Sequence, residues 1–215
     1  MSSLGNLQQA DLQRFVTVTA AGCYYAIESG DQTDARSLLQ NILATAMSPL
    51  LSDFEDSERD RIVQLSQSEF VSLSSPQQKL PAGNLSELLP TVLPALSERE
   101  RVVLTESRQG LFLDYTGVTQ AEAEELAVLA AGLRSTAEKR TALLTGQLAI
   151  TSRAFGIVDP AGNSEIGFWP MHISNNVFTL IVLGIPRFNS QQFCTLVWAL
   201  IERYGPHLLA HAKTE

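Results

Sequence analysis

Residues 101–204 decide the fold, and they begin with the sequence RVVLTESRQGLFLDYTGVTQAEAEEL, residues 101–126. Two short apolar runs, 102–105 and 111–115, flank the polar stretch 106–110, which ends in glycine. This pattern is typical of a β-hairpin, because glycine accepts the positive φ that a tight turn requires. We therefore expect the segment to open with two paired strands.

A long helix is expected directly after this hairpin. Thr119 and Glu122 have the spacing of a capping box, in which the hydroxyl accepts an amide proton and the carboxylate reaches back to the cap. The helix should run from Thr119 to about Leu144. Three strands, 150–158, 165–170 and 177–183, and a last helix capped by Asn189 or Ser190 should follow. The third of these strands is almost entirely apolar, which favours a central place in the sheet.

The predicted central helix carries two apolar stripes. The bulky stripe, suited to packing on a sheet, consists of Leu126, Leu129, Leu133 and Ala137. The small stripe consists of Ala123, Ala127 and Ala131, four residues apart. Alanine is the best helix former, and this alone would account for the small stripe. The alternative is that small side chains let another helix approach, so that this face pairs with its copy in a homodimer.

The N-terminal third is expected to be all-helical, with helices at 7–29, 34–51 and 56–71. Pro76, Pro81 and Gly83 then mark a linker. The expected organisation is a helical N-terminal segment at 1–73, a linker at 74–84, an α+β domain at 85–205 and a tail at 206–215. Within the domain, the first helix, 85–96, is interrupted by Pro90 and Pro94.

Composition narrows the classes of partner. The chain has 215 residues and a net charge of −8, which argues against binding nucleic acid or an anionic membrane surface. The longest apolar run, 177–186, is too short to span a bilayer. The first residues show no signal-peptide pattern, so a cytoplasmic protein is expected.

No catalytic residue, cofactor site or metal site is assigned from the sequence. Phosphate-binding glycine loops and the Gly-x-Ser-x-Gly elbow are both absent. Cys23 and Cys194 lie in apolar helical patterns and are expected to be buried and reduced. His207 and His211 are four residues apart, but no third metal ligand accompanies them. The chain is therefore expected not to be an enzyme.

The order of elements after residue 85 resembles the roadblock (dynein light chain) family of small-GTPase regulators. The resemblance lies in residues 101–115, which look like that family's first hairpin, and in 122–138, which look like its long central helix. It implies a five-stranded antiparallel sheet with the long helix on one face. The interrupted helix containing Pro90 and Pro94 departs from the family pattern.

The same resemblance implies a homodimer that joins the central helices and third strands. It therefore places Phe155 and Ile157, with Ala123, Ala127 and Ala131, at a dimer interface. It further implies binding of a Ras-like small GTPase. Arg134 and Glu138 on the central helix are candidate contacts for that partner, and the alternative is that they are solvated surface charges.

Two other functions remain open at this level. One is a small-molecule-sensing module with its ligand between sheet and helix, although bulky apolar residues facing the sheet favour a filled core. The other is a non-catalytic subunit of a larger assembly, with the N-terminal helices as its docking arm. A family resemblance by itself does not choose among these functions.

Overall fold

The computed structural model describes residues 11–106, 111–150 and 152–205. It confirms the expected fold class, a mixed α+β architecture built on a five-stranded antiparallel sheet with the order β4-β3-β7-β6-β5. The strands are β3 (Arg101–Glu106), β4 (Leu111–Thr116), β5 (Phe155–Val158), β6 (Ser164–Ile173) and β7 (Asn176–Leu183). The predicted turn at 107–110, the tail at 206–215 and both His207 and His211 lie outside the described residues.

The sheet separates two hydrophobic layers because side chains alternate between its faces. One face carries the cross-strand row Val103, Ile181, Phe168 and Phe155. The opposite face carries rows such as Leu104, Leu180 and Trp169. Strand β7 is central, as its apolar sequence predicted, and its residues Leu180 to Val182 are fully buried.

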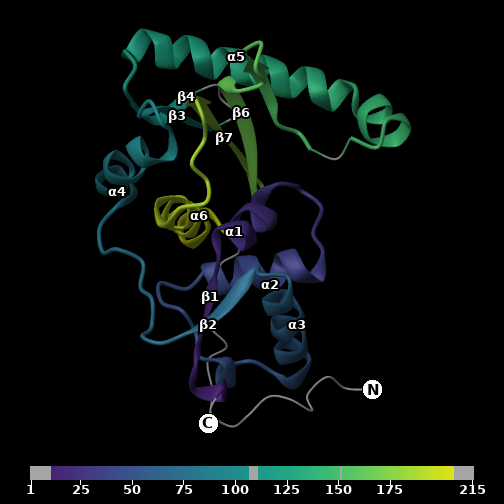
Figure 1. The fold of residues 1–215 in the computed structure, drawn as a ribbon, viewed down its shortest axis with the longest axis vertical. Helices are drawn as coiled ribbons and strands as arrows, with labels where there is room; N and C mark the ends of the chain where they lie inside the picture. The colour runs from purple at the N-terminus through teal and green to yellow at the C-terminus, as the bar shows by residue number, and fades with distance from the viewer. Residues whose placement is uncertain (1–10, 107–110, 151, 206–215) are drawn as a thin grey trace.

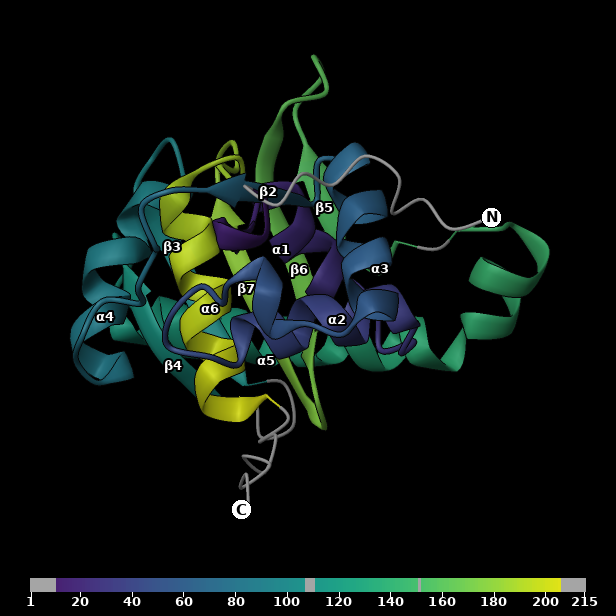
Figure 2. The same ribbon diagram turned by 90° about the horizontal axis from the view of Figure 1, so that it is seen from below.

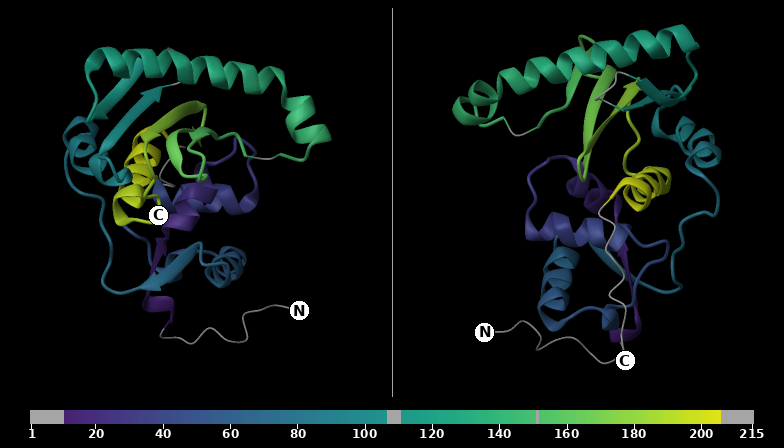
Figure 3. Two further views of the ribbon diagram at one scale, coloured as in Figure 1. Left: turned by 45° about the horizontal axis from the view of Figure 1, so that its top comes forward. Right: turned by 180° about the vertical axis from the view of Figure 1, so that it is seen from behind.

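The central helix α5 (Gln120–Lys139) packs across the first of these faces (Figure 1). Its predicted capping box is confirmed, since the Thr119 hydroxyl accepts the Glu122 amide and Glu122 Oε2 accepts the Thr119 amide at 2.7 Å. The α-helix ends at Lys139, earlier than predicted. A π-helical turn, η5 (Ala142–Gln147), continues it beyond the edge of the sheet (Figure 3).

The small stripe of α5 faces the chain's own sheet, and this corrects the proposed use of the stripe for pairing with another helix. Ala123 and Ala127 have 0% and 1% of their surface exposed, and Ala131 is half-buried. The sheet below presents the large side chains Phe168 and Ile181. Small residues on the helix therefore let its axis come close to the sheet without overpacking.

Helices α4 (Leu85–Val92) and α6 (Gln191–Tyr204) cover the other face of the sheet, together with the 3-10 turn η4 (Pro94–Leu96). The prolines shorten the first helix as predicted, with Pro90 inside α4 and Pro94 opening η4. Ser190 caps α6 by accepting the Phe193 amide at 3.3 Å. Eight of the nine residues between Phe193 and Ile201 are buried, so α6 is enclosed on most of its sides.

The N-terminal segment is not all-helical, which corrects the second part of the fold prediction. It contains a two-stranded antiparallel sheet, β1 (Phe15–Val18) with β2 (Val71–Ser74). Its other elements are η2 (Asp11–Gln13), α1 (Ala20–Ile27), α2 (Asp34–Leu43), η3 (Leu51–Asp53) and α3 (Asp56–Gln67). In the described part of the predicted helix 7–29, the apolar spacing belongs to the turn η2, the strand β1 and a short helix that Thr19 caps.

One hydrophobic core crosses from the N-terminal segment into the domain. Helices α1 and α2 pack beneath α6 (Figure 2), and their buried residues belong to the same cluster as those of α6 and the lower sheet face. The Trp198 indole donates a hydrogen bond to the Thr45 carbonyl at 2.6 Å. The predicted linker also packs on the N-terminal segment, where the Leu80 amide donates a hydrogen bond to the Ala46 carbonyl at 2.9 Å. Figure 1 shows α5 above the sheet, α6 and α1 below it, and α2, α3 and the β1–β2 sheet further down.

Candidate functional site

Exposed apolar side chains gather on one part of the molecule. Within the described residues, seven of the ten exposed large hydrophobic side chains belong to α5, to the segment that continues it, or to β5. The seven are Val128, Leu129, Leu143, Leu148, Ile150, Ile157 and Val158. We call these residues the α5/β5 surface. A concentration of this kind is typical of a protein interface, whereas isolated exposed hydrophobic residues are ordinary.

The strand β5 forms one edge of the sheet. It pairs with β6 on one side, and the described residues place no strand on its other side. Ile157 and Val158 are 58% and 60% exposed, whereas Phe155 is half-buried and packs into the layer under α5. An open edge strand with apolar side chains can pair with another strand unless the protein blocks it. Of the two β5 residues predicted at a dimer interface, Ile157 is therefore available and Phe155 largely supports the core.

The outer side of α5 is the second part of this surface. Val128 is 68% exposed, and Gly132, one turn further, has open space where a side chain would begin. Beside them a groove of about 430 Å³ separates α5 from the end of the sheet. Its apolar lining comes from Val118, Leu126, Leu129 and Leu183, and Arg101, Glu122 and Glu125 form its charged rim. Leu129, predicted to face the sheet, instead lies at this groove and is 48% exposed.

Arg134 and Glu138, the predicted partner contacts, lie elsewhere on α5. Arg134 Nη1 binds Glu138 Oε1 at 2.7 Å, an i,i+4 ion pair. Both residues line a cleft that faces the loop between α1 and α2. The structure thus separates them from Val128 and Leu129, and groups them with residues that the sequence did not single out.

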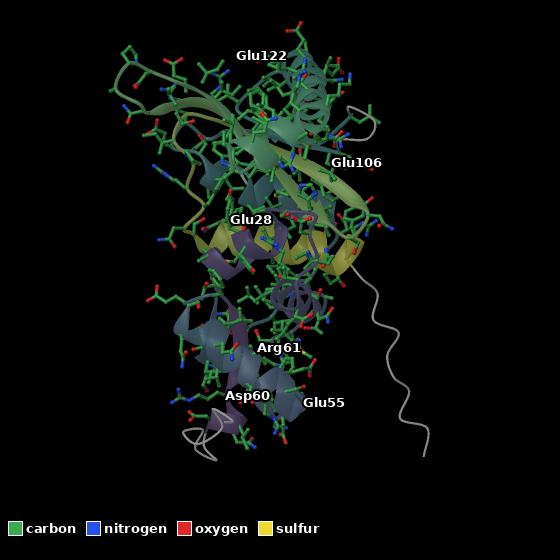
Figure 4. The ribbon with its side chains drawn as sticks, turned by 90° about the vertical axis from the view of Figure 1, so that its right-hand side faces the viewer. Glu28, Glu55, Asp60, Arg61, Glu106 and Glu122 are labelled. Carbon is green, nitrogen blue, oxygen red and sulfur yellow. The ribbon has the colours of Figure 1, made fainter. Side chains whose placement is uncertain are left out.

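The cleft between α5 and the N-terminal segment has two adjoining compartments. One has a volume of about 330 Å³ and the other about 250 Å³, and both are lined by Ser29, Asp31, Arg153 and Pro170. Glu28, in the wall of the larger compartment, lies midway along the molecule below the sheet, far from Glu122 at the α5 end (Figure 4). Sequence patterns gave no signal for this cleft, because its walls come from segments more than a hundred residues apart.

His172 lies in the smaller compartment, opposite the α1–α2 loop. The ring is close to Gly30, where a Cβ atom would lie 3.3 Å from Nδ1. Burial lowers the pKa of His172, and the positive charges of Arg153 and Arg134 lower it further. Asp31 and Glu138 act in the opposite direction. Burial and the two arginines therefore favour the neutral imidazole over the protonated ring.

Neither a metal cluster nor a membrane-spanning helix is found in the parts of the chain that the structure describes. Within residues 11–106, 111–150 and 152–205, no three His, Cys, Asp or Glu side chains are grouped closely enough to hold a metal ion. None of the helices in those ranges is both long and apolar enough to cross a membrane.

Comparisons with known proteins give one distant similarity. No protein-family model and no curated protein matches the chain. Among solved structures, the chain is similar to a Roadblock/LC7 domain from Streptomyces avermitilis. The two share 16% sequence identity with a TM-score of 0.34, and the match covers 56% of this chain and 93% of that domain. At this level the similarity concerns the fold alone.

Proposed function

We propose that this protein is a homodimeric, roadblock-like binding protein that regulates a Ras-like small GTPase or scaffolds an assembly containing one. The observation that carries the dimer is the α5/β5 surface, where an open strand edge and an exposed apolar helix side occur together. The GTPase is the partner that the resemblance of the strand and helix order implies. The protein acts by contact and is not an enzyme.

A second copy of the chain could cover both parts of the α5/β5 surface, the open edge of β5 and the exposed apolar side of α5. Pairing of two β5 edges continues the sheet across the dimer and satisfies the open backbone groups of each strand. Two α5 helices then lie on the same face of that extended sheet. Fully burying a side chain such as Ile157 or Leu129 contributes on the order of 1.5–3 kcal/mol. Several such residues offset the entropy lost on association.

The interior of the domain favours a protein-binding function over a small-molecule-sensing function, because the space between sheet and helix is filled. Phe168, Ile181 and Val103 meet the alanines of α5, and all of these side chains are almost completely buried. The N-terminal segment packs on its own domain through α1 and α2, so these helices are part of the fold and do not form a detached docking arm. Both observations favour a surface that acts on another protein.

Binding to purified Ras-like GTPases tests the proposed partner. Each GTPase is loaded with GDP or with a non-hydrolysable GTP analogue, and affinity is measured by biolayer interferometry. We expect at least one GTPase to bind with different affinities in its two nucleotide states, because a regulator must distinguish them. Equal affinity for both states would support the scaffold form of the proposal. Absence of binding across a broad panel of Ras-like GTPases would contradict the proposed GTPase partner. It would not affect the proposed homodimer, which light scattering tests separately.

A further inference from the structure

We propose that the cleft between the α1–α2 loop and the C-terminal half of α5 binds a small oxyanion, a carboxylate or phosphate group, through Arg153 and Arg134 with His172 beside them. The site is separate from the α5/β5 surface. Its residues come from the N-terminal segment, α5, β6 and the chain preceding β5.

Arg153 is placed to be the main ligand of the anion. It lines both compartments of the cleft, and its Nη1 donates to the Thr141 hydroxyl at 3.0 Å. That bond anchors the guanidinium while using one of its five N–H donors. A planar guanidinium held in this way can bind two oxygens of one carboxylate or phosphate group.

The charges in the cleft walls favour an anion next to Arg153. Glu28 is paired with Arg36 at 2.9 Å, and Glu138 is paired with Arg134 at 2.7 Å. Within the described residues, no carboxylate oxygen lies within 4 Å of the Arg153 guanidinium. Asp31 is the remaining carboxylate of the walls, and it accepts a hydrogen bond from the Ser29 hydroxyl at 3.2 Å. Its charge opposes a second anion and so limits the affinity of the site.

His172 lies within reach of the same charges, including the Arg134–Glu138 ion pair. Its ring lies close to Gly30 of the loop, and the charges of Arg153, Arg134, Asp31 and Glu138 act on it. The two arginines repel a proton on the ring, and an anion bound between them would offset that repulsion. Binding should therefore raise the pKa of His172, and a protonated ring would add a hydrogen-bond donor to the site.

Ring resonances of His172 provide the test, measured by NMR on the full chain and assigned with His172→Gln. Sodium phosphate and sodium acetate are titrated separately at constant ionic strength. We expect the His172 signals to shift saturably and its pKa to rise. Saturation by phosphate alone identifies a phosphate site, and saturation by both identifies a general carboxylate and phosphate site. Absence of saturation with both probes would overturn the proposal.

Three variants separate specific binding from general screening. Arg153→Gln should weaken binding about tenfold or more, because it removes a charge-assisted hydrogen bond. Asp31→Asn should strengthen binding, since it removes the opposing charge and keeps an acceptor for Ser29. Arg187→Gln changes an exposed arginine that does not line the cleft, and it should leave affinity unchanged. Equal affinities in all three variants, with circular dichroism showing that each is folded, would contradict the assignment.

Discussion

Ala127 and Val128 are neighbours in the chain and have opposite environments. Ala127 is 1% exposed against the sheet, whereas Val128 is 68% exposed on the outer side of α5. Hydrophobicity alone would bury the valine, so the observed orientation depends on volume. Phe168, Ile181 and Val103 already fill the sheet face, so small side chains occupy the buried helix positions above them.

Enlarging Ala127 should therefore destabilise the fold. Ala127→Leu adds three carbon atoms to a filled layer, and we expect it to lower the free energy of unfolding by about 1–3 kcal/mol. Ala121→Leu is the matched control, because Ala121 is exposed on the same helix and its replacement should be nearly neutral. Urea unfolding followed by circular dichroism measures both. Equal stability of the two variants would show that α5 does not lie close to the sheet through its alanines.

His172 should make stability depend on pH. Burial, followed by the charges of Arg153 and Arg134, lowers its pKa in the folded state below the ordinary value of 6.5, while Asp31 and Glu138 partly oppose this. Above 6.5 both states are neutral and the full stability is present. Below it the unfolded chain takes up a proton that the folded chain refuses, so the free energy of unfolding falls until the pH reaches the folded pKa.

The measurement compares wild type and His172→Gln by urea unfolding at about pH 7.5 and about pH 5.5. We expect wild type to lose more stability than the variant over this interval. A low ionic strength without phosphate is required, because the cleft is proposed to bind that anion. The same loss in both proteins would assign the pH dependence to other groups.

At the scale of elements, the sequence patterns predicted the elements with local signals and missed those that depend on distant partners. The capping box of Thr119, the central β7 and the cap of α6, predicted at Asn189 or Ser190 and found at Ser190, all rest on neighbouring residues. Strand β1 pairs with β2, for example through Thr17 and Ser74, whose hydroxyls lie 2.8 Å apart across 57 positions of sequence. No local pattern contains that information, so the apolar spacing predicts part of a helix there.

The same reasoning explains the errors within α5. The helix and its two stripes were predicted from periodicity, but the choice of stripe depends on which side chains the sheet contributes. The periodicity predicts Leu129 on the sheet and Ala127 at a dimer interface, whereas the structure buries Ala127 and leaves Leu129 48% exposed. The cleft around Arg153 was missed for a similar reason, because Ser29, Arg134 and His172 meet only after the chain has folded.

The cap of α5 gives a prediction at this scale. Thr119→Ala removes the hydroxyl that accepts the Glu122 amide, and we expect it to cost about 1 kcal/mol of unfolding free energy. Hydrogen bonds from the backbone and side chain of Thr119 lower the pKa of Glu122, and Arg101 adds to this effect. NMR titration of the Glu122 carboxylate should show its pKa returning towards the ordinary value in the variant. An unchanged pKa would mean that the capping box does not form in solution.

At the scale of the whole molecule, the N-terminal segment and the domain form one folded unit. The largest hydrophobic cluster includes Val16 and Leu39 of the segment together with Leu104 and Phe193 of the domain. This arrangement covers α6 and leaves α5 and β5 on the opposite side as the uncovered apolar part of the protein. In Figures 1 and 3, α5 lies on the side of the sheet opposite to α6 and the N-terminal segment.

Light scattering after size-exclusion chromatography measures this association most directly, using wild type, Ile157→Asp and the matched control Ile185→Asp. Ile185 is exposed like Ile157 but lies outside the α5/β5 surface. We predict that wild type and Ile185→Asp have twice the chain mass of 23.5 kDa, and that Ile157→Asp has the mass of a single chain. A wild-type mass of 23.5 kDa at every concentration, or a dimer that Ile157→Asp leaves intact, would contradict the proposed interface.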